Sequence, residues 1–251
     1  MNENLFPQWL LAVALSAACV TASAQLPGGD GSPGLSTAML KLFGGVTTFS
    51  ARVDVQVLDQ TQTEHVRTPM LFAELDGRLR VEIDMGLMRG KDLPPAAVAG
   101  LKQLGMDRVI SLSRPDKKAQ FIIYPNAQSY VNLPLSKEET AAAAQNLTVV
   151  KTALAKETVD GHPCVKNQVI VKSGTNVVLT ATTWNAADLK DFPVQITTRE
   201  NALTTVMRFQ QIQLARPDAK QFEVPAGFKP YNDAQTLVLA RSKKVQNGMK
   251  K

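Results

Sequence analysis

Cysteine and histidine are nearly absent from this chain of 251 residues, which contains two of each. A disulfide framework needs several cysteines, and a structural zinc site needs four ligands close together. Asp160, His162 and Cys164 alternate along one stretch, but Asp160 suits a tight turn and no fourth ligand lies nearby. We therefore expect no metal and no cofactor, and a fold that is held by its apolar core.

Motifs for catalysis are also missing. The chain has no Gly-x-Ser-x-Gly sequence, which argues against a serine nucleophile on a strand-to-helix turn. The run from Gly86 to Lys91 is one residue too short for a phosphate-binding loop and lacks the following Ser or Thr. Glu82 and Asp84 alternate as they would on the wet face of a strand. The sequence predicts a protein that is not an enzyme.

Long apolar runs are lacking too, because the stretch that begins at Trp9 is interrupted by serine and threonine after Leu15. Small residues then end in Ala22-Ser23-Ala24, the pattern that signal peptidase cleaves. We expect residues 1–24 to be a signal peptide, with cleavage between Ala24 and Gln25 and export to the periplasm. Lipidation of Cys19 is the alternative, but the large aliphatic residue that should stand three places before it is displaced by one.

Positive charge is in modest excess, with 28 Lys and Arg against 22 Asp and Glu and a net charge of +6. The charges are spread along the chain, and aromatic residues make up only 6% of it, so we expect no nucleic-acid partner. The one local excess runs from Arg241 to Lys251. We interpret it as a solubilising tail, with peripheral contact to an anionic membrane as the alternative.

Residues 49–57 alternate between apolar and polar side chains, as expected of a strand with one buried face. Asp76-Gly77 and Asp160-Gly161 predict two tight hairpin turns. An interruption of the apolar phase at Gln210-Gln211 predicts a bulge. Further strands are predicted at 109–113, 120–124, 177–184, 192–198 and 203–214. Helices are predicted at 36–42, after Pro94-Pro95, after a capping box at Ser136 and Glu139, and from Asp233. The last of these is expected to fray into Lys243, Lys244, Lys250 and Lys251.

Two motifs carry a resemblance to a known group of proteins. They are Glu157-x-x-x-Gly161-x-x-Cys164 and Phe222-x-Val224-Pro225-x-Gly227-Phe228. Together with Trp184-Asn185 and Phe192-Pro193, they resemble an uncharacterised family of exported bacterial domains of unknown function. That family is similar to the periplasmic lipoprotein-carrier, or LolA-like, superfamily. The resemblance implies a half-open antiparallel barrel around an apolar cavity that helices close.

These observations predict an α+β fold: a mostly antiparallel, curled half-barrel sheet with a few helices covering its concave face. We expect a linker and short helix at 25–45, the half-barrel at 46–230, and a C-terminal helix and basic tail at 231–251. The expected function is binding or transport of an apolar ligand, such as an acyl chain, lipid or lipidated peptide. A cell-envelope interaction or sensor module, with a protein partner, is the alternative. The predicted cavity-lining residues are Phe121, Ile123, Trp184, Met207 and Phe209.

Overall fold

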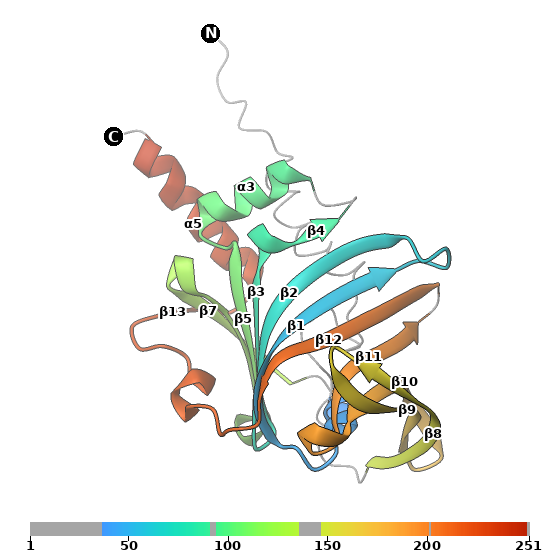
Figure 1. Cartoon of the computed structure of the whole chain (residues 1–251). Coiled ribbons are helices and arrows are strands. Elements are labelled where there is room, and N and C mark those ends of the chain that lie inside the picture. Colours follow the sequence, from blue (N-terminus) through green and yellow to red (C-terminus); the bar gives the residue numbers. More distant parts are fainter. Residues whose placement is uncertain (1–36, 91–93, 136–146, 201, 250–251) are drawn as a thin grey trace.

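The structure is a computed structural model that describes residues 37–90, 94–135, 147–200 and 202–249 (Figure 1). The predicted signal peptide with Cys19, the cleavage point between Ala24 and Gln25, and the capping box at Ser136 and Glu139 lie outside the described residues. They stay predictions.

Thirteen strands form a single sheet in the described part of the chain. Its order is β13-β7-β6-β5-β3-β2-β1-β12-β11-β10-β9-β8, and β4 pairs with β2 beside this path. Every pairing is antiparallel except the parallel pairing of β13 with β7. The strands are β1 (Thr48–Leu58), β2 (Glu64–Leu75), β3 (Arg78–Asp84), β4 (Arg89–Gly90), β5 (Arg108–Arg114), β6 (Ala119–Tyr124), β7 (Ser129–Pro134), β8 (Leu147–Val159), β9 (His162–Ser173), β10 (Asn176–Ala186), β11 (Phe192–Glu200), β12 (Leu203–Gln213) and β13 (Lys229–Tyr231).

The described residues also form three α-helices, α2 (Thr37–Leu40), α3 (Pro95–Leu104) and α5 (Ala234–Met249). Short 3-10 helices are η1 (Lys41–Phe43), η2 (Met85–Leu87), η3 (Pro115–Lys117), η4 (Pro125–Ala127), η5 (Ala187–Leu189) and η6 (Ala219–Phe222). The prediction of a mostly antiparallel sheet with few helices is confirmed. The predicted strong curl is not observed, because the sheet is open: β13 and β8 stand at opposite ends of the strand order. Helices, rather than closure of the sheet, cover its apolar face.

The two predicted hairpin turns are confirmed by their backbone angles. Asp76 and Gly77 have φ values of 49° and 82°, and Asp160 and Gly161 have values of 49° and 85°. Two successive residues at positive φ give the turn whose twist matches that of the flanking strands. The predicted bulge is also present, since the pairing of β1 with β12 changes register between Ser50 and Arg52, where Gln211 has φ 51°.

The inner face of the sheet is the face that carries the main core. Alternate residues of β1, including Phe49 and Val53, point to this face, and they pack with Phe72 of β2 and Phe209 of β12. The α2–η1 segment lies on them and inserts Phe43, which is 1% exposed. Farther along the same face, α3 and α5 cover Val109, Ile122 and Val131 of strands β5 to β7, with Leu237 and Val238 of α5 fully or almost fully buried.

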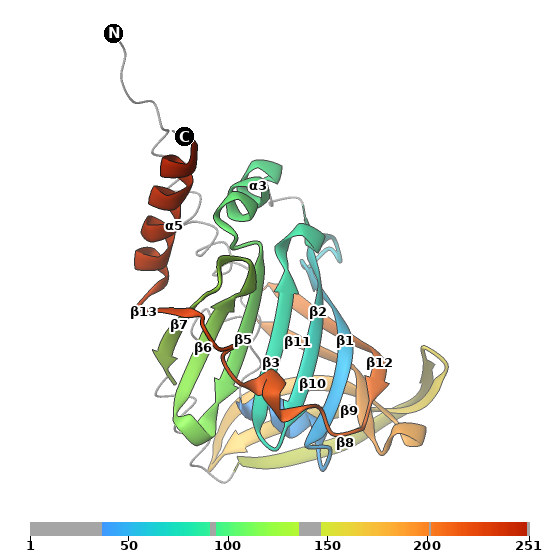
Figure 2. The ribbon, with the colours of Figure 1, turned by 90° about the vertical axis from the view of Figure 1, so that its left-hand side faces the viewer.

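The outer face is crossed by a segment that we call the strap, residues 214–228, which leads from β12 to β13 (Figure 2). Phe222 of the strap is fully buried against Ala73 and Leu75 of β2. Val224 and Phe228 pack over an apolar group on β5 and β6. The middle of the sheet is therefore covered on both faces.

The C-terminal helix was predicted to fray at Lys243 and Lys244, and this is wrong, because both lie within α5; Lys250 and Lys251 are outside the described residues. Helix α5 continues through Met249. Its start is fixed by Asp233, whose Oδ1 accepts a hydrogen bond of 2.6 Å from the backbone N–H of Thr236. This is an N-cap, and Leu237 and Val238 then anchor the first turns on the sheet. Lys243 and Lys244 therefore belong to an anchored helix.

Gly77→Val should destabilise the protein by about 1–3 kcal/mol, because a β-branched residue at positive φ is strained. A Cβ at Gly77 would meet nothing within 4 Å, so the cost would come from the backbone alone. Gly45→Val is the matched control, since its surroundings are equally open and its φ is not positive. Denaturant unfolding measures both variants. Equal stabilities for the two would contradict the turn assignment.

Candidate functional site

The structure distributes the five predicted cavity residues over two clusters. Met207 and Phe209 of β12 lie in the main core on the inner face, and each is 2% exposed. Ile123 and Phe121 of β6 belong to the outer-face cluster beneath the strap. The fifth residue, Trp184, is on β10. The structure therefore brings Met207 together with Phe209 and Ile123 together with Phe121, but it does not join the two pairs.

Trp184 is partly buried against the main core, and its indole also takes part in a polar cluster. Its indole Nε1 donates a hydrogen bond of 2.7 Å to Oε2 of Glu157, and Lys166 Nζ lies 5.0 Å from the centre of the ring. Lys166 also forms an ion pair with Glu157 at 3.2 Å. The hydrogen bond to Trp184 and that to Lys166 hold the pKa of Glu157 below its usual value. Trp184 is therefore tied to charged neighbours on β8 and β9.

The centre of the inner face is filled by aromatic side chains. The ring of Phe43 lies 4.8 Å from that of Phe49, 5.4 Å from both Phe192 and Phe209, and 6.0 Å from Phe72. These separations are typical of packed aromatic pairs. An apolar ligand at the centre of the inner face would have to displace Phe43.

Toward β8 the inner face continues beyond this helical cover. Val171 of β9 is fully buried, and it pairs directly with Val149 of β8 and with Leu179 of β10. Directly paired residues point to the same face. Leu179 and Leu147 are half-buried against the core, and Val149 is 40% exposed. Among the described residues, the apolar surface of the core thus reaches solvent at Val149 on the edge strand β8, and we call Leu147, Val149 and Leu179 the uncovered apolar row.

A buried carboxylate lies elsewhere in the core. Glu74 of β2 is 4% exposed, and its Oε2 has no hydrogen-bond partner. It stands between Phe49 of β1 and Leu79 of β3. Burial raises the pKa of Glu74 to about 7, and the negative charge of Asp76 contributes to this shift. Sequence reasoning missed Glu74, although it continues the inner-face alternation of Met70 and Phe72.

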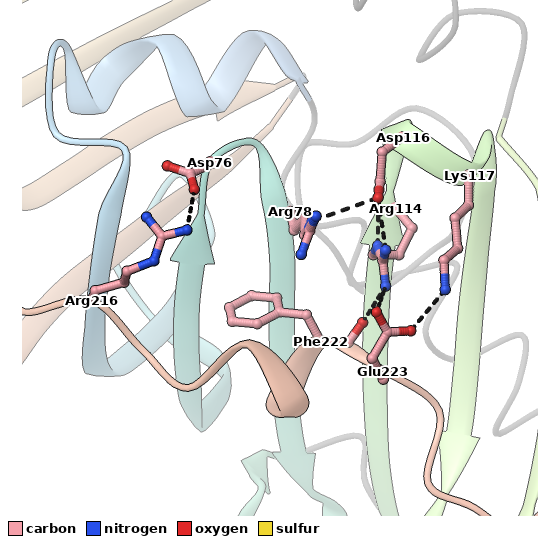
Figure 3. A network of polar contacts seen from close by, with 8 residues as sticks. All are labelled: Asp76, Arg78, Arg114, Asp116, Lys117, Arg216, Phe222 and Glu223. Carbon is pink, nitrogen blue, oxygen red and sulfur yellow. Dashed lines mark hydrogen bonds and ion pairs between the residues drawn. The ribbon is translucent and has the colours of Figure 1, made fainter.

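Charged residues fasten the strap to the outer face (Figure 3). Arg114 is 3% exposed, and its Nη1 donates to the carbonyl oxygen of Phe222 at 2.8 Å and to Oε1 of Glu223 at 2.6 Å. Its other nitrogens bind both oxygens of Asp116, and this pairing lowers the pKa of Asp116 to about 2. Lys117 holds Glu223 from a second side at 2.7 Å. The charges of this network are paired with one another, and these pairs hold the strap in place.

The residues that alternate after the second hairpin turn do not gather into a metal site. His162 Nδ1 lies 2.8 Å from Oδ2 of Asp188, and the thiol of Cys164 donates to the carbonyl oxygen of His162 itself. Burial raises the pKa of Cys164, which disfavours the reactive thiolate. Within the described ranges, no group of three His, Cys, Asp or Glu residues is placed to hold a metal ion.

Neither a protein-family model nor a curated protein matches the sequence. Among solved structures, a LolA superfamily protein from Nitrosomonas europaea is similar, with 10% identity, a TM-score of 0.36, and coverage of 76% of this chain and 98% of that one. The lipoprotein LppX of Mycobacterium tuberculosis is similar with 11% identity, a TM-score of 0.35 and coverage of 82% and 96%. A DUF1329 family protein from Desulfovibrio piger is similar with 10% identity, a TM-score of 0.29 and coverage of 85% and 97%.

The structural similarity is thus to a LolA superfamily protein, a lipoprotein and a DUF1329 family protein, each at low sequence identity. It gives this chain no ligand, partner or reaction. No helix in the described part of the chain combines the length and apolar character that a membrane crossing requires.

The stability of the protein should decrease as the pH rises from about 4.5 to 7, because Glu74 binds its proton more tightly in the folded state. Below this range both states are protonated, and above it both are ionised. A shift from 4.5 to about 7 corresponds to up to about 3 kcal/mol. Glu74→Gln should remove most of this decrease, as measured by denaturant unfolding across the range.

Glu200→Gln is the matched control, since Glu200 is an exposed carboxylate at the end of β11. It should keep the pH dependence of the original protein. A Glu74→Gln protein with an unchanged pH dependence would show that Glu74 is not the group responsible.

Proposed function

We propose that this protein binds an apolar ligand, such as an acyl chain, a lipid or a lipidated peptide, as a periplasmic carrier. The observation that carries the proposal is the uncovered apolar row: the buried surface around Val171 continues to Val149, which is 40% exposed on the edge strand. Exposed apolar surface that is continuous with a core is a common feature of binding sites. No catalytic step is part of this proposal.

The ligand would lie along β8 to β10 rather than at the centre of the inner face. Phe43 and its aromatic neighbours already fill the centre. A ligand placed beside Val149 and Leu179 would instead extend the existing core without displacing any residue from it. Of the five residues predicted from the sequence, Met207 and Phe209 would then support the site from within the core, and their contact with ligand stays a prediction.

A fluorescent fatty acid should bind the purified protein with micromolar affinity, or roughly −8 kcal/mol. Val149→Asp should weaken this binding by on the order of tenfold or more, because the ligand would have to desolvate a carboxylate. Thr148→Asp is the matched control, since Thr148 is the adjacent exposed residue and points to the opposite face. Met207→Asp is unsuitable, because Met207 is 2% exposed and the change would disturb folding.

Two results would contradict the proposal. One is a folded protein that neither binds the probe nor retains lipid after purification. The other is an equal loss of affinity in Val149→Asp and Thr148→Asp, because that would indicate a general effect of negative charge.

A second candidate function is that of a cell-envelope interaction module, and one observation favours it. Strand β8 is 13 residues long and pairs only with β9 in the described part of the chain. An unpaired edge is able to accept an extended segment of another protein. The strand also has features that discourage indiscriminate pairing, namely Lys151, Lys156 and a bulge at Leu154. Residues 147–153 form the regular stretch.

A photo-cross-linking residue at Thr152, within this stretch, should give discrete protein adducts in living cells if the edge accepts a partner. The same cross-linking residue at Thr182 should give no adducts and serves as the control, because Thr182 is on β10, which is paired on both sides with β9 and β11. Absence of adducts at Thr152, or equal adducts at both positions, would contradict the interaction module.

A further inference from the structure

One end of the molecule is formed by four elements whose described charged side chains are all basic. Helices α3 and α5, together with η2 and β4, lie at the same end of the sheet in both views (Figures 1 and 2). Their described residues include five basic side chains, Arg89, Lys102, Arg241, Lys243 and Lys244, and no Asp or Glu. We call these four elements the basic helical end.

Acidic residues do flank this end, but local hydrogen bonds occupy them. Asp84 Oδ1 accepts from the backbone N–H of Gly86 at 2.9 Å, and Asp233 caps the start of α5. Asp107 Oδ1 accepts from Asn126 Nδ2 at 2.9 Å. None of the three carboxylates forms an ion pair with a basic residue of the end, and the five basic residues outnumber these three acidic neighbours.

The basic side chains are available to a partner. Arg89, Lys102, Lys243 and Lys244 are all exposed. Arg241 has a different role, because its Nε donates to the carbonyl oxygen of Leu104 at 2.8 Å and fastens α5 to the end of α3. This hydrogen bond links α3 and α5, the two helices that carry the lysines.

Two large apolar side chains lie among these charges. Leu87 of η2 is 54% exposed, and Leu239 of α5 is 41% exposed. They stand on different elements. Single apolar residues surrounded by lysine and arginine suit a diffuse anionic surface into which isolated side chains insert.

We propose that the basic helical end docks on a membrane surface rich in anionic phospholipids. Lysine ammonium groups are attracted to such a surface at short range, and Leu87 and Leu239 would enter its interface. The proposal does not rest on the apolar-ligand function. Strand β8 lies at the opposite end of the molecule in both views, so docking would leave the uncovered apolar row accessible (Figures 1 and 2).

Sedimentation with lipid vesicles tests this inference directly. The purified protein should bind vesicles of phosphatidylcholine mixed with phosphatidylglycerol, but not vesicles of phosphatidylcholine alone, and added salt should weaken binding because it screens the charges. The double variant Lys243→Glu and Lys244→Glu should bind the mixed vesicles at least about tenfold more weakly than the original protein. Both positions are exposed, so the double variant is expected to fold. Its melting midpoint checks this.

The double variant Lys156→Glu and Lys220→Glu is the matched control. It changes the net charge equally at exposed positions on β8 and η6, outside the basic helical end. It should retain most of the binding. Failure of the original protein to bind the mixed vesicles, or equal loss in both double variants, would overturn the proposal. Binding of soluble polyglutamate as tight as vesicle binding would also overturn it, because that result would indicate an acidic protein partner.

Discussion

The packing of Phe43 against the inner face organises the main core of the protein. The ring of Phe43 lies on a short helical segment and packs against four other phenylalanines, one on each of strands β1, β2, β11 and β12. Removing a buried Phe costs about 3–5 kcal/mol in other cores, a large share of the stability of one domain. The same packing also decides where a ligand is able to bind, because it fills the centre of the face that would otherwise hold one.

The two faces of the sheet are covered by different means, and this explains why the predicted cavity residues fall into two clusters. The inner face is covered by helices, while the outer face of β5 and β6 is covered by the strap. The buried guanidinium of Arg114 stabilises the strap through two bonds to its backbone and side chain. Strand β6 is consequently apolar on both faces, so alternation does not tell which of its residues point inward.

Local features were predictable from the sequence because they depend on neighbouring residues. The Asp-Gly pairs specify tight turns through their tolerance of positive φ, and the strict alternation in residues 49–57 predicts β1. Asp233 predicts the start of α5. The extent of that helix was not predicted, because its lysines were interpreted as an irregular tail, whereas Leu237 and Val238 anchor it to the sheet.

Features that depend on distant contacts were not predictable in the same way. The first half of β8 contains polar and exposed residues on both faces, so it has no alternation to reveal it. The burial of Phe222 depends on a strap that returns to β2 across the sheet. The position of Glu74 was within reach of the alternation in β2, but a carboxylate in a core contradicts the usual rule that charged groups are exposed. An apolar site on the sheet stays a prediction, and the structure places Met207 and Phe209, two of its five predicted residues, in the filled core.

We propose that an apolar ligand contacts the uncovered apolar row and not the filled centre of the inner face. Methyl NMR with a spin-labelled fatty acid measures this most directly, because the label broadens the signals of nearby methyl groups. We expect the methyl signals of Val149 and Leu179 to broaden selectively. Those of Val53 and Ile196 in the buried core should be unaffected. Broadening centred on Val53 and Ile196 would contradict it, because the ligand would then occupy the space that Phe43 fills.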